Sequence, residues 1–431
     1  MKFEVLKRSN LKRNILIGVI AILMISAIIL NFTRAKYRAT QSIPLVNGTI
    51  NYSLADLNVI AVYIGNGNDY SKSDTVPSNG YIFNEEKSYC TVNDEENTNI
   101  TLSYDVDTQT LNIAPFTTKG TKCYLYFDEQ KTFKDIILAD NGGTSTIEGK
   151  DTPDFSQPAT TDEGIYATTD NLGTTYYFRG AVTNNYISFA EYYWRIIRIN
   201  GDGSIRIIYD GTSAHANGES SDDRQIGTSA YNSTDNASYY VGYTYQADAQ
   251  RPSSQNGGTP STIKEVLDSW YSTNITNQGY DSKVVSTAGF CNDRNMASGY
   301  SWSATPSSTI RYAVDERLYT NKTPTLKCSN NNDIYTTKVG LITADEVAYA
   351  GGVWGQNNNS YYLYTGQFYW TISPSYFAST GYANVYFVRS DGNLRSYSLD
   401  NVIGVRPVIN LSADITISSG DGTQSNPYVI S

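Results

Sequence analysis

The stretch Val339–Gly352, VGLITADEVAYAGG, decides how the C-terminal part of the chain folds. Thr343 and Glu346 have the spacing of a capping box, in which the threonine caps a helix start and the glutamate reaches back to the threonine N–H. The two glycines at the end of the stretch readily take the left-handed conformation that ends a helix. The stretch therefore predicts a short helix over 344–350.

Strand-forming residues follow this helix in five runs, Tyr361–Thr365, Gln367–Ile372, Ala383–Arg389, Leu394–Leu399 and Gly404–Leu411. The Asp391-Gly392 pair between two of these runs is a hairpin signal. Pro374 should end the second run, and Pro407 places part of the last run at a sheet edge or a bulge. The whole region is therefore expected to form a small strand-rich unit.

Four motifs in this region carry a family resemblance: GLITADEVAYAGG (340–352), YWTISP (369–374), VYFVRSDGNL (385–394) and GVRPVINL (404–411). In this order they resemble a domain of unassigned function from bacterial surface proteins. That domain is similar to a divergent C-type-lectin-like fold of the formylglycine-generating-enzyme and tropism-determinant type. The resemblance begins near Ile165 and implies this fold for residues 165–431. It says little about function, because one fold carries many chemistries.

Composition and charge describe a secreted or surface protein rather than a nucleic-acid-binding one. The chain has 431 residues, 37 of them tyrosine, and a net charge of −10. Residues 1–40 carry eight Lys/Arg and one Glu, or +7, so residues 41–431 carry −17. A region this acidic argues against nucleic-acid partners and against electrostatic docking on anionic lipid.

The N-terminal segment predicts a membrane anchor. Residues 15–32 are apolar and uncharged, which is long enough for a helix to cross most of a bilayer. Basic residues are in excess on the N-terminal side, so residues 1–14 should be a cytoplasmic tail and the rest exported. The alternative is a cleaved signal peptide, for which 33–35 offers small residues at the cleavage positions. We expect an uncleaved signal anchor in contact with the lipid bilayer and a single-pass protein of the cell membrane.

Beyond the anchor the expected class is α+β, in two folded domains. Residues 43–128 contain short strands and turns at the spacing of a small β-sandwich. Residues 129–164 have the composition of a linker, with a brief helix or strand expected at 133–138, and residues 165–431 form the C-type-lectin-like domain. Within that domain, Asn200–Gly203 predicts a hairpin, and the apolar stripe of Ser261–Tyr271 predicts a core helix.

Four cysteines are expected to form two disulfides. Cys90 and Cys123 lie in the first predicted domain, and Cys291 and Cys328 lie in the second. Pairing within each domain keeps each bridge inside one folding unit. The sequence has no C-x-x-C pair and a single histidine, so a metal site is the weaker interpretation.

No motif in the sequence indicates catalysis. His215 is the one histidine, and its polar loop predicts a solvated side chain rather than a general base. No cysteine follows Cys328, so the reactive thiol of sulfatase-activating relatives of this fold has no counterpart, and the calcium motifs of C-type lectins are also absent. We expect no metal, no cofactor and no enzyme activity. The alternative is a cell-wall or glycan-directed hydrolase that uses two carboxylates.

The composition of the C-terminal strands favours a binding function. Segments 357–364 and 375–382 combine Tyr, Ser, Asn and Gly as antibody paratopes do. The expected function is an adhesin or receptor-like protein that binds an extracellular protein or glycan. The residues expected to contact this ligand are Trp354, Tyr361, Tyr362, Tyr364, Tyr376, Tyr382 and Tyr386. The alternative for these tyrosines is that they only cover a sheet.

Overall fold

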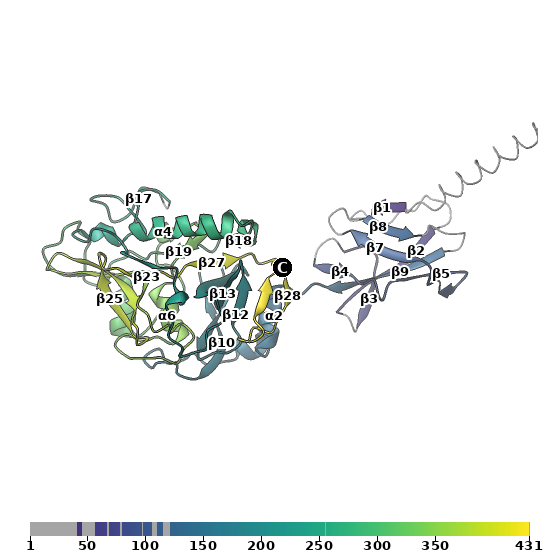
Figure 1. Ribbon diagram of the computed structural model, residues 1–431, viewed down its shortest axis with the longest axis horizontal. Coiled ribbons are helices and arrows are strands. Elements are labelled where there is room, and N and C mark those ends of the chain that lie inside the picture. Colours follow the sequence, from purple (N-terminus) through teal and green to yellow (C-terminus); the bar gives the residue numbers. More distant parts are fainter. Residues whose placement is uncertain are drawn as a thin grey trace, which may run out of the picture. The chain divides into compact units, whose positions relative to one another are not determined.

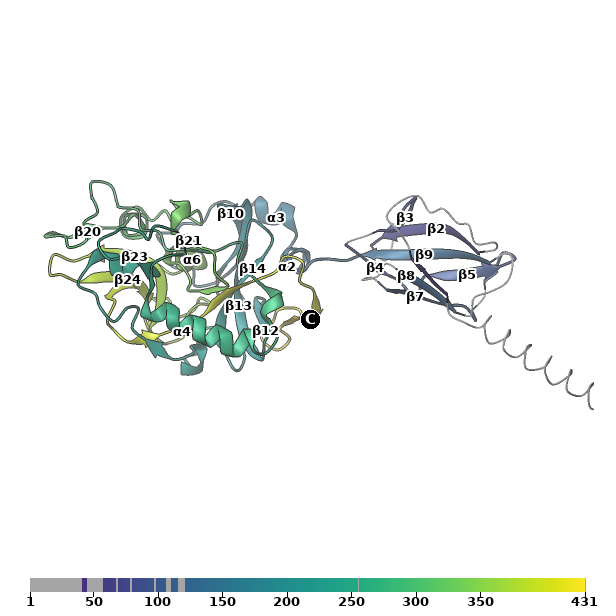
Figure 2. The same cartoon turned by 90° about the horizontal axis from the view of Figure 1, so that it is seen from above.

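A computed structural model of the chain describes residues 41–44, 57–66, 69–77, 80–96, 98–105, 110–114, 121–254 and 256–430. The chain forms two compact units that divide between Lys131 and Thr132 (Figures 1 and 2). Each unit has its own hydrophobic core. The expected α+β class, rich in strands and with a few short helices, is confirmed.

The predicted anchor at 15–32 and tail at 1–14 lie outside the described residues. No helix within the described ranges is long and apolar enough to cross a membrane.

The first unit is a β-sandwich. One sheet has the order β1 (Gln41–Pro44), β8 (Thr110–Ala114), β7 (Thr101–Asp105). The other has the order β3 (Tyr70–Ser73), β2 (Leu57–Gly65), β9 (Thr121–Glu129), β5 (Tyr89–Val92), β6 (Glu95–Glu96), with β4 (Tyr81–Phe83) also paired to β9. Strands β2 and β9 are parallel, and the other pairs are antiparallel.

Alternation along β9 explains why the two sheets pack together. Cys123, Leu125 and Phe127 are buried, whereas the residues between them are half-buried. These side chains share one apolar core with Leu111 and Ile113 of the facing sheet. Alternating side chains of a strand point to opposite faces, so one face of β9 supplies the core and the other is available to solvent.

Both expected disulfides are confirmed. Cys90 on β5 lies directly opposite Cys123 on β9 and is bonded to it. Cys291 is bonded to Cys328 in the second unit. Each bridge therefore stays within one compact unit.

Replacing Cys90 and Cys123 by serine should destabilise the first unit by about 3–4 kcal/mol, because a bridge across a loop of this length restricts the unfolded chain. Because each unit has its own core, calorimetry of the full chain should show one transition moving to lower temperature and the other unchanged. The matched control is the Cys291→Ser, Cys328→Ser chain, which should move only the other transition. If either pair moved both transitions equally, the division into two units would be wrong.

The linker expected at 129–164 is corrected by the structure. Helix α2 (Phe133–Asp140) and helix α3 (Thr144–Glu148) lie in it. Phe133, Ile137 and Ile147 from these helices are buried in the core of the second unit. The brief helix or strand expected at 133–138 is a helix, whereas α3 and the burial of both helices in the core were not expected, because the stretch is polar overall.

The second unit contains a large mixed sheet. Its path is β18 (Val284–Val285), β27 (Val408–Leu411), β14 (Ile205–Gly211), β13 (Tyr192–Ile199), β12 (Tyr186–Phe189), β29 (Tyr428–Ile430), β28 (Ile417–Ser419). Three more strands join it: β11 (Thr174–Gly180) on β13, β10 (Asp162–Thr169) on β11, and β22 (Val339–Gly340) on β27. Strands β13 and β14 are buried along most of their length, so this sheet forms the centre of the core.

A second sheet of this unit carries the C-terminal hairpin. Its path is β15 (Thr228–Ser229), β26 (Ile403–Gly404), β23 (Tyr369–Phe377), β24 (Ala383–Val388), β25 (Leu394–Ser398), with β20 (Ile310–Arg311) on β23. Strand β25 is therefore an edge strand (Figure 1). Two small ladders complete the strands: β16 (Thr244–Tyr245) with β17 (Thr259–Pro260), and β19 (Phe290–Cys291) with β21 (Ile334–Tyr335).

Short helices connect and cover these sheets. The remaining α-helices are α4 (Thr262–Tyr271), α5 (Ala313–Asp315) and α6 (Ala344–Ala350). Two π-helical turns, η3 (Ser272–Thr276) and η5 (Glu316–Asn321), continue α4 and α5. The 3-10 turns are η1 (Asp222–Arg224), η2 (Ser238–Val241), η4 (Asp281–Lys283) and η6 (Asn331–Asp333).

Most of the local sequence signals are confirmed. The Thr343–Glu346 capping box is present in both directions, and Gly351 ends α6 in the left-handed conformation with φ 115°. Asn200–Gly203 joins β13 to β14, and Asp391-Gly392 joins β24 to β25. The apolar stripe of α4, which includes Ile263 and Leu267, is buried as expected.

Two strand predictions are wrong. The run 361–365 is a buried turn, in which the Tyr364 N–H donates to the Tyr361 carbonyl. Its side chains enter the core on several sides, which overrides their preference for strands. Pro374 does not end a strand either, because β23 continues through it with a shift of register on both sides. A bulge accommodates a proline that cannot donate to the ladder.

Candidate functional site

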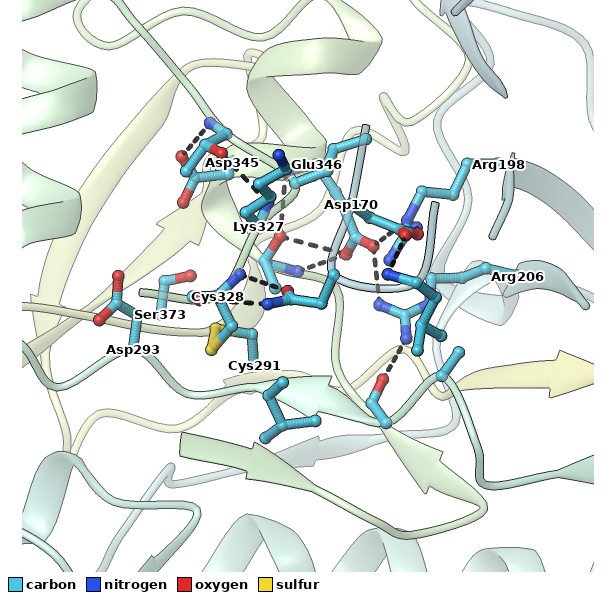
Figure 3. Close-up of a pocket in the computed structure, with 18 of the residues that line it drawn as sticks. Asp170, Arg198, Arg206, Cys291, Asp293, Lys327, Cys328, Asp345, Glu346 and Ser373 are labelled. Atoms are coloured by element: carbon cyan, nitrogen blue, oxygen red, sulfur yellow. Dashed lines mark hydrogen bonds and ion pairs between the residues drawn. A yellow bond between two sulfur atoms is a disulfide. The ribbon is translucent and has the colours of Figure 1, made fainter. Parts of the chain in front are cut away.

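A small charged cavity lies between the large sheet and helix α6 (Figure 3). Its volume is about 70 Å³, far below the several hundred Å³ of sites that enclose drug-sized ligands. The Cys291–Cys328 disulfide is part of its wall. The charged side chains that line it are Asp170, Arg198, Arg206, Asp293, Arg317, Lys327, Asp345 and Glu346.

Glu346 is the centre of the ion pairs in this cavity. One carboxylate oxygen, Oε1, accepts from Arg198 Nε at 2.9 Å and from Arg206 Nη1 at 2.8 Å. The other oxygen accepts from the Thr343 N–H at 2.9 Å and so completes the capping box. Asp170 holds the far side of Arg198 at 2.6 Å. The same glutamate therefore starts α6 and fastens it to β13 and β14.

These charges suit a structural role rather than acid catalysis. Burial alone would raise the pKa of Glu346, but the positive charges of Arg206 and Arg198 outweigh it and lower the pKa to about 2. A general acid at neutral pH needs the opposite shift. Asp345 is likewise engaged, because Arg317 donates to both of its oxygens, at 3.1 and 2.8 Å.

Changing Glu346→Gln should destabilise the second unit by about 3 kcal/mol or more, because it leaves buried guanidinium groups without their counter-charge. The pKa of Glu346 is depressed on folding, so its stabilisation is present above its ordinary pKa of 4.5 and is lost as the pH falls toward 2. Urea unfolding at pH 7 and at pH 3 measures both effects. The difference in the free energy of unfolding between wild type and variant should be smaller at pH 3 than at pH 7.

The matched control for this variant is Glu265→Gln, which changes an exposed glutamate in the first turn of α4. It should shift the free energy of unfolding by no more than about 0.5 kcal/mol. Equal effects of the two substitutions would contradict the role assigned to Glu346.

His215 is corrected from a solvated to a buried side chain, 5 % exposed. Gly211 makes room for it, since a Cβ there would lie 3.0 Å from His215 Nε2. Its Nδ1 faces Glu219 at 2.8 Å, and its Nε2 faces Asp223 at 2.9 Å. Hydrogen bonding to His215 lowers the pKa of Glu219. Burial would raise the pKa of Asp223, but hydrogen bonds from Ser221 and His215 lower it to about 2.

The surroundings of His215 do not make it a base for a serine nucleophile. Ser213 Oγ lies 3.4 Å from His215 Nε2, at the long end for a hydrogen bond. The same nitrogen is closer to the Asp223 carboxylate, which only accepts hydrogen bonds. Each ring nitrogen thus lies closer to a carboxylate than to the serine hydroxyl, which is not the serine–histidine geometry of a catalytic triad.

The seven residues expected to bind a ligand do not share one surface. Tyr361, Tyr362 and Tyr386 are fully buried, so they are core residues and the prediction is corrected for them. Trp354, Tyr364 and Tyr376 are half-buried, and Tyr382 is 52 % exposed. Alternation along a strand predicts which residues share a face, but it does not predict which face other segments cover. Both faces of β24 are buried.

Two of these residues, Trp354 and Tyr376, belong to a row of aromatic and arginine side chains that runs from β20 and β23 to Trp354 at the edge of β25. The Tyr319 ring meets the Trp354 ring at 5.4 Å, and Arg395 lies over Trp354 at 5.3 Å. Arg311 lies 5.9 Å from the Tyr319 ring and 5.6 Å from the Tyr376 ring.

A second group of aromatic side chains lies on the face of the hairpin that carries Phe387, opposite the face on which Tyr386 contacts Trp354. Arg395 lies directly opposite Phe387, whose ring stacks on Tyr397 at 5.1 Å and contacts Phe368 at 5.8 Å. Tyr319 is 50 % exposed, Phe368 39 % and Tyr397 40 %. We refer to the accessible members of the two groups, which Arg395 relates because it contacts Trp354 and lies opposite Phe387, as the aromatic–arginine surface: Arg311, Tyr319, Trp354, Phe368, Arg395 and Tyr397.

A buried carboxylate supports one end of this surface. Asp315 is 1 % exposed and forms an ion pair with Arg311. One of its oxygens also accepts from the hydroxyls of Ser375 and Tyr386, each at 3.1 Å. The Tyr386 ring in turn contacts Trp354 at 5.6 Å. The exposed rings thus stand on side chains that are fixed in the core.

Arg395 differs from the other arginines of the second unit. Among the described residues, only Arg195 and Arg395 lack a carboxylate within 4.0 Å there, and Arg195 is fully buried. Arg395 is half-buried and lies over an aromatic ring, so its donors remain available to a partner. Sequence inspection missed Arg311, Tyr319 and Arg395, because only the fold brings them to Trp354.

No cluster of three or more His, Cys, Asp or Glu that could hold a metal is present in the part of the chain that the structure describes.

Comparison of the chain with family models, with curated proteins and with solved structures finds no match. The resemblance to the C-type-lectin-like fold therefore stays a prediction from the motifs.

Proposed function

We propose that this protein is a membrane-anchored, exported surface protein that binds an extracellular ligand through the aromatic–arginine surface of its second unit. One observation carries the proposal: exposed aromatic rings and an arginine without a counter-charge gather on side chains held rigidly by the core. Trp, Tyr and Arg are the residue types that dominate binding energy at protein interfaces.

The rigidity of the surface favours binding. A surface that is already ordered loses little side-chain entropy when a ligand arrives. Trp354 is held by the Tyr386 ring beneath it and by a β-bridge to Leu394. The residues assigned here replace the tyrosines of 361–364, whose rings are buried or half-buried.

A glycan hydrolase, the alternative expected from the sequence, has less support. Such an enzyme needs a carboxyl group that stays protonated near neutral pH. The carboxylates that line the charged cavity are paired with arginines, and the pKa of Glu346 is lowered. We therefore do not assign hydrolysis to the cavity.

The proposal predicts that Tyr319→Ala weakens ligand binding by about ten-fold or more, the range seen for interface hot spots. Tyr382→Ala is the matched control, because Tyr382 is equally exposed, at 52 % against 50 %, and makes no ring contact with the surface. The full chain in mild detergent is applied to arrays of bacterial and host glycans and of extracellular proteins. Equal loss in both variants, or no loss in Tyr319→Ala, would refute this surface as the ligand site.

The exported topology has its own test. Because positive charges are concentrated before residues 15–32, we expect everything after that segment to be outside the cell. Protease added to intact cells should remove an epitope tag placed at the C-terminus. Complete protection of the tag, with cleavage after lysis, would place the second unit inside.

A further inference from the structure

Strand β25 ends its sheet, and part of its outer edge is unpaired. Leu399 N–H donates to Ala383 O, and Arg389 N–H donates to Asn393 O, which fixes the alternation of the hairpin. Residues 393, 395, 397 and 399 therefore direct their backbone groups toward β24, and residues 394, 396 and 398 direct theirs outward. The outer edge is thus formed by Leu394, Ser396 and Ser398.

The first position of this edge already accepts a neighbouring segment. Leu394 N–H donates to Val353 O at 3.4 Å, and Trp354 forms a parallel bridge with Leu394. At the far end the Ser398 carbonyl accepts from the Asn401 N–H at 3.2 Å, so Ser396 between them is the unpaired position. Among the described residues, the backbone N–H and C=O of Ser396 have no hydrogen-bond partner, and Ser396 is half-buried rather than covered.

The side chains around this free edge have opposite charges at its two ends. Arg395, without a carboxylate partner, lies over Trp354 at one end. At the other end the Ser398 hydroxyl lies within hydrogen-bond distance of the carboxylates of both Asp235 and Asp400, to either of which it can donate its one proton. The exposed ring of Tyr397 lies between them in sequence and beside Phe387.

We propose that an extended peptide segment of a protein partner adds to the edge of β25, with an acidic side chain bound by Arg395. This inference rests on the proposed function, because the edge adjoins Trp354 and Arg395 of the aromatic–arginine surface, and it names the ligand class as a protein segment rather than a glycan. Backbone pairing at Ser396 supplies affinity that depends little on sequence, and Arg395 with the neighbouring rings supplies selectivity.

The test uses the full chain in mild detergent and an array of eight-residue peptides of alternating Thr and Val. Glu or Gln is scanned through the four central positions, and each Glu peptide is also made with N-methylated backbone amides. Glu peptides should bind about ten-fold more tightly than their Gln counterparts, because a Gln peptide lacks the charge-assisted hydrogen bond to Arg395. Arg395→Gln should remove this preference, and N-methylation should abolish binding.

Ser396 gives a matched pair of variants. Ser396→Pro removes the outward N–H without breaking a bond to β24, and prolines are tolerated on edge strands in that position. It should weaken peptide binding by about ten-fold, whereas Ser396→Ala should leave it within two-fold. Unchanged thermal unfolding and near-UV circular dichroism of both variants confirm that the fold is intact.

Several outcomes overturn the inference. It fails if Ser396→Pro binds as tightly as wild type, or if no Glu peptide binds. If a ligand from the broad arrays is lost in Tyr319→Ala but kept in Ser396→Pro, the surface stands and strand addition is wrong. If Tyr319→Ala keeps that ligand, the proposed function itself fails.

Discussion

The fold of the second unit depends on one buried glutamate whose two carboxylate oxygens bind different partners. Glu346 Oε2 satisfies the Thr343 N–H at the start of α6, and Oε1 joins two arginines on β13 and β14. A buried charge is tolerable only where it is paired and fully hydrogen-bonded, so this arrangement strongly restricts where α6 can lie. A helix of seven residues has little stability of its own and needs such tertiary contacts.

The position of α6 sets the aromatic–arginine surface. On one side, Arg317 of η5 forms an ion pair with Asp345 of α6. This ion pair fixes the position of η5, which contains Tyr319. On the other side, the chain leaves α6 through Gly351 and within three residues reaches Trp354, which bridges to the edge of β25. The Tyr319–Trp354 contact therefore joins two segments whose positions both depend on α6, one through an ion pair and the other through the chain. Rigid scaffolding of exposed residues is how many binding sites are built.

Sequence could predict what is local and could not predict what is long-range. The sequence predicted the capping box, two hairpins and the amphipathic helix α4, because these depend on residues close in sequence. It also predicted both disulfides, because each domain contains two cysteines. The second role of Glu346 was not predicted, because its partner Arg198 lies 148 residues away. The prediction that Tyr361 and Tyr362 contact a ligand was wrong for the same reason, because strand propensity does not indicate what packs against a segment.

Charge also limits which ligands this surface can select. The chain beyond its first forty residues carries −17. The negative field of such a protein repels a polyanion that comes within about a Debye length, ~8 Å, and is screened by salt at longer range. Arg395 acts only at short range, over Trp354, and acidic side chains lie at the other end of β25. A segment with a single acidic residue and no other charge experiences little of this repulsion when it contacts the guanidinium, whereas a polyanion is repelled strongly. For the binding function proposed above, this charge distribution favours a lightly charged partner over an acidic polysaccharide or a nucleic acid.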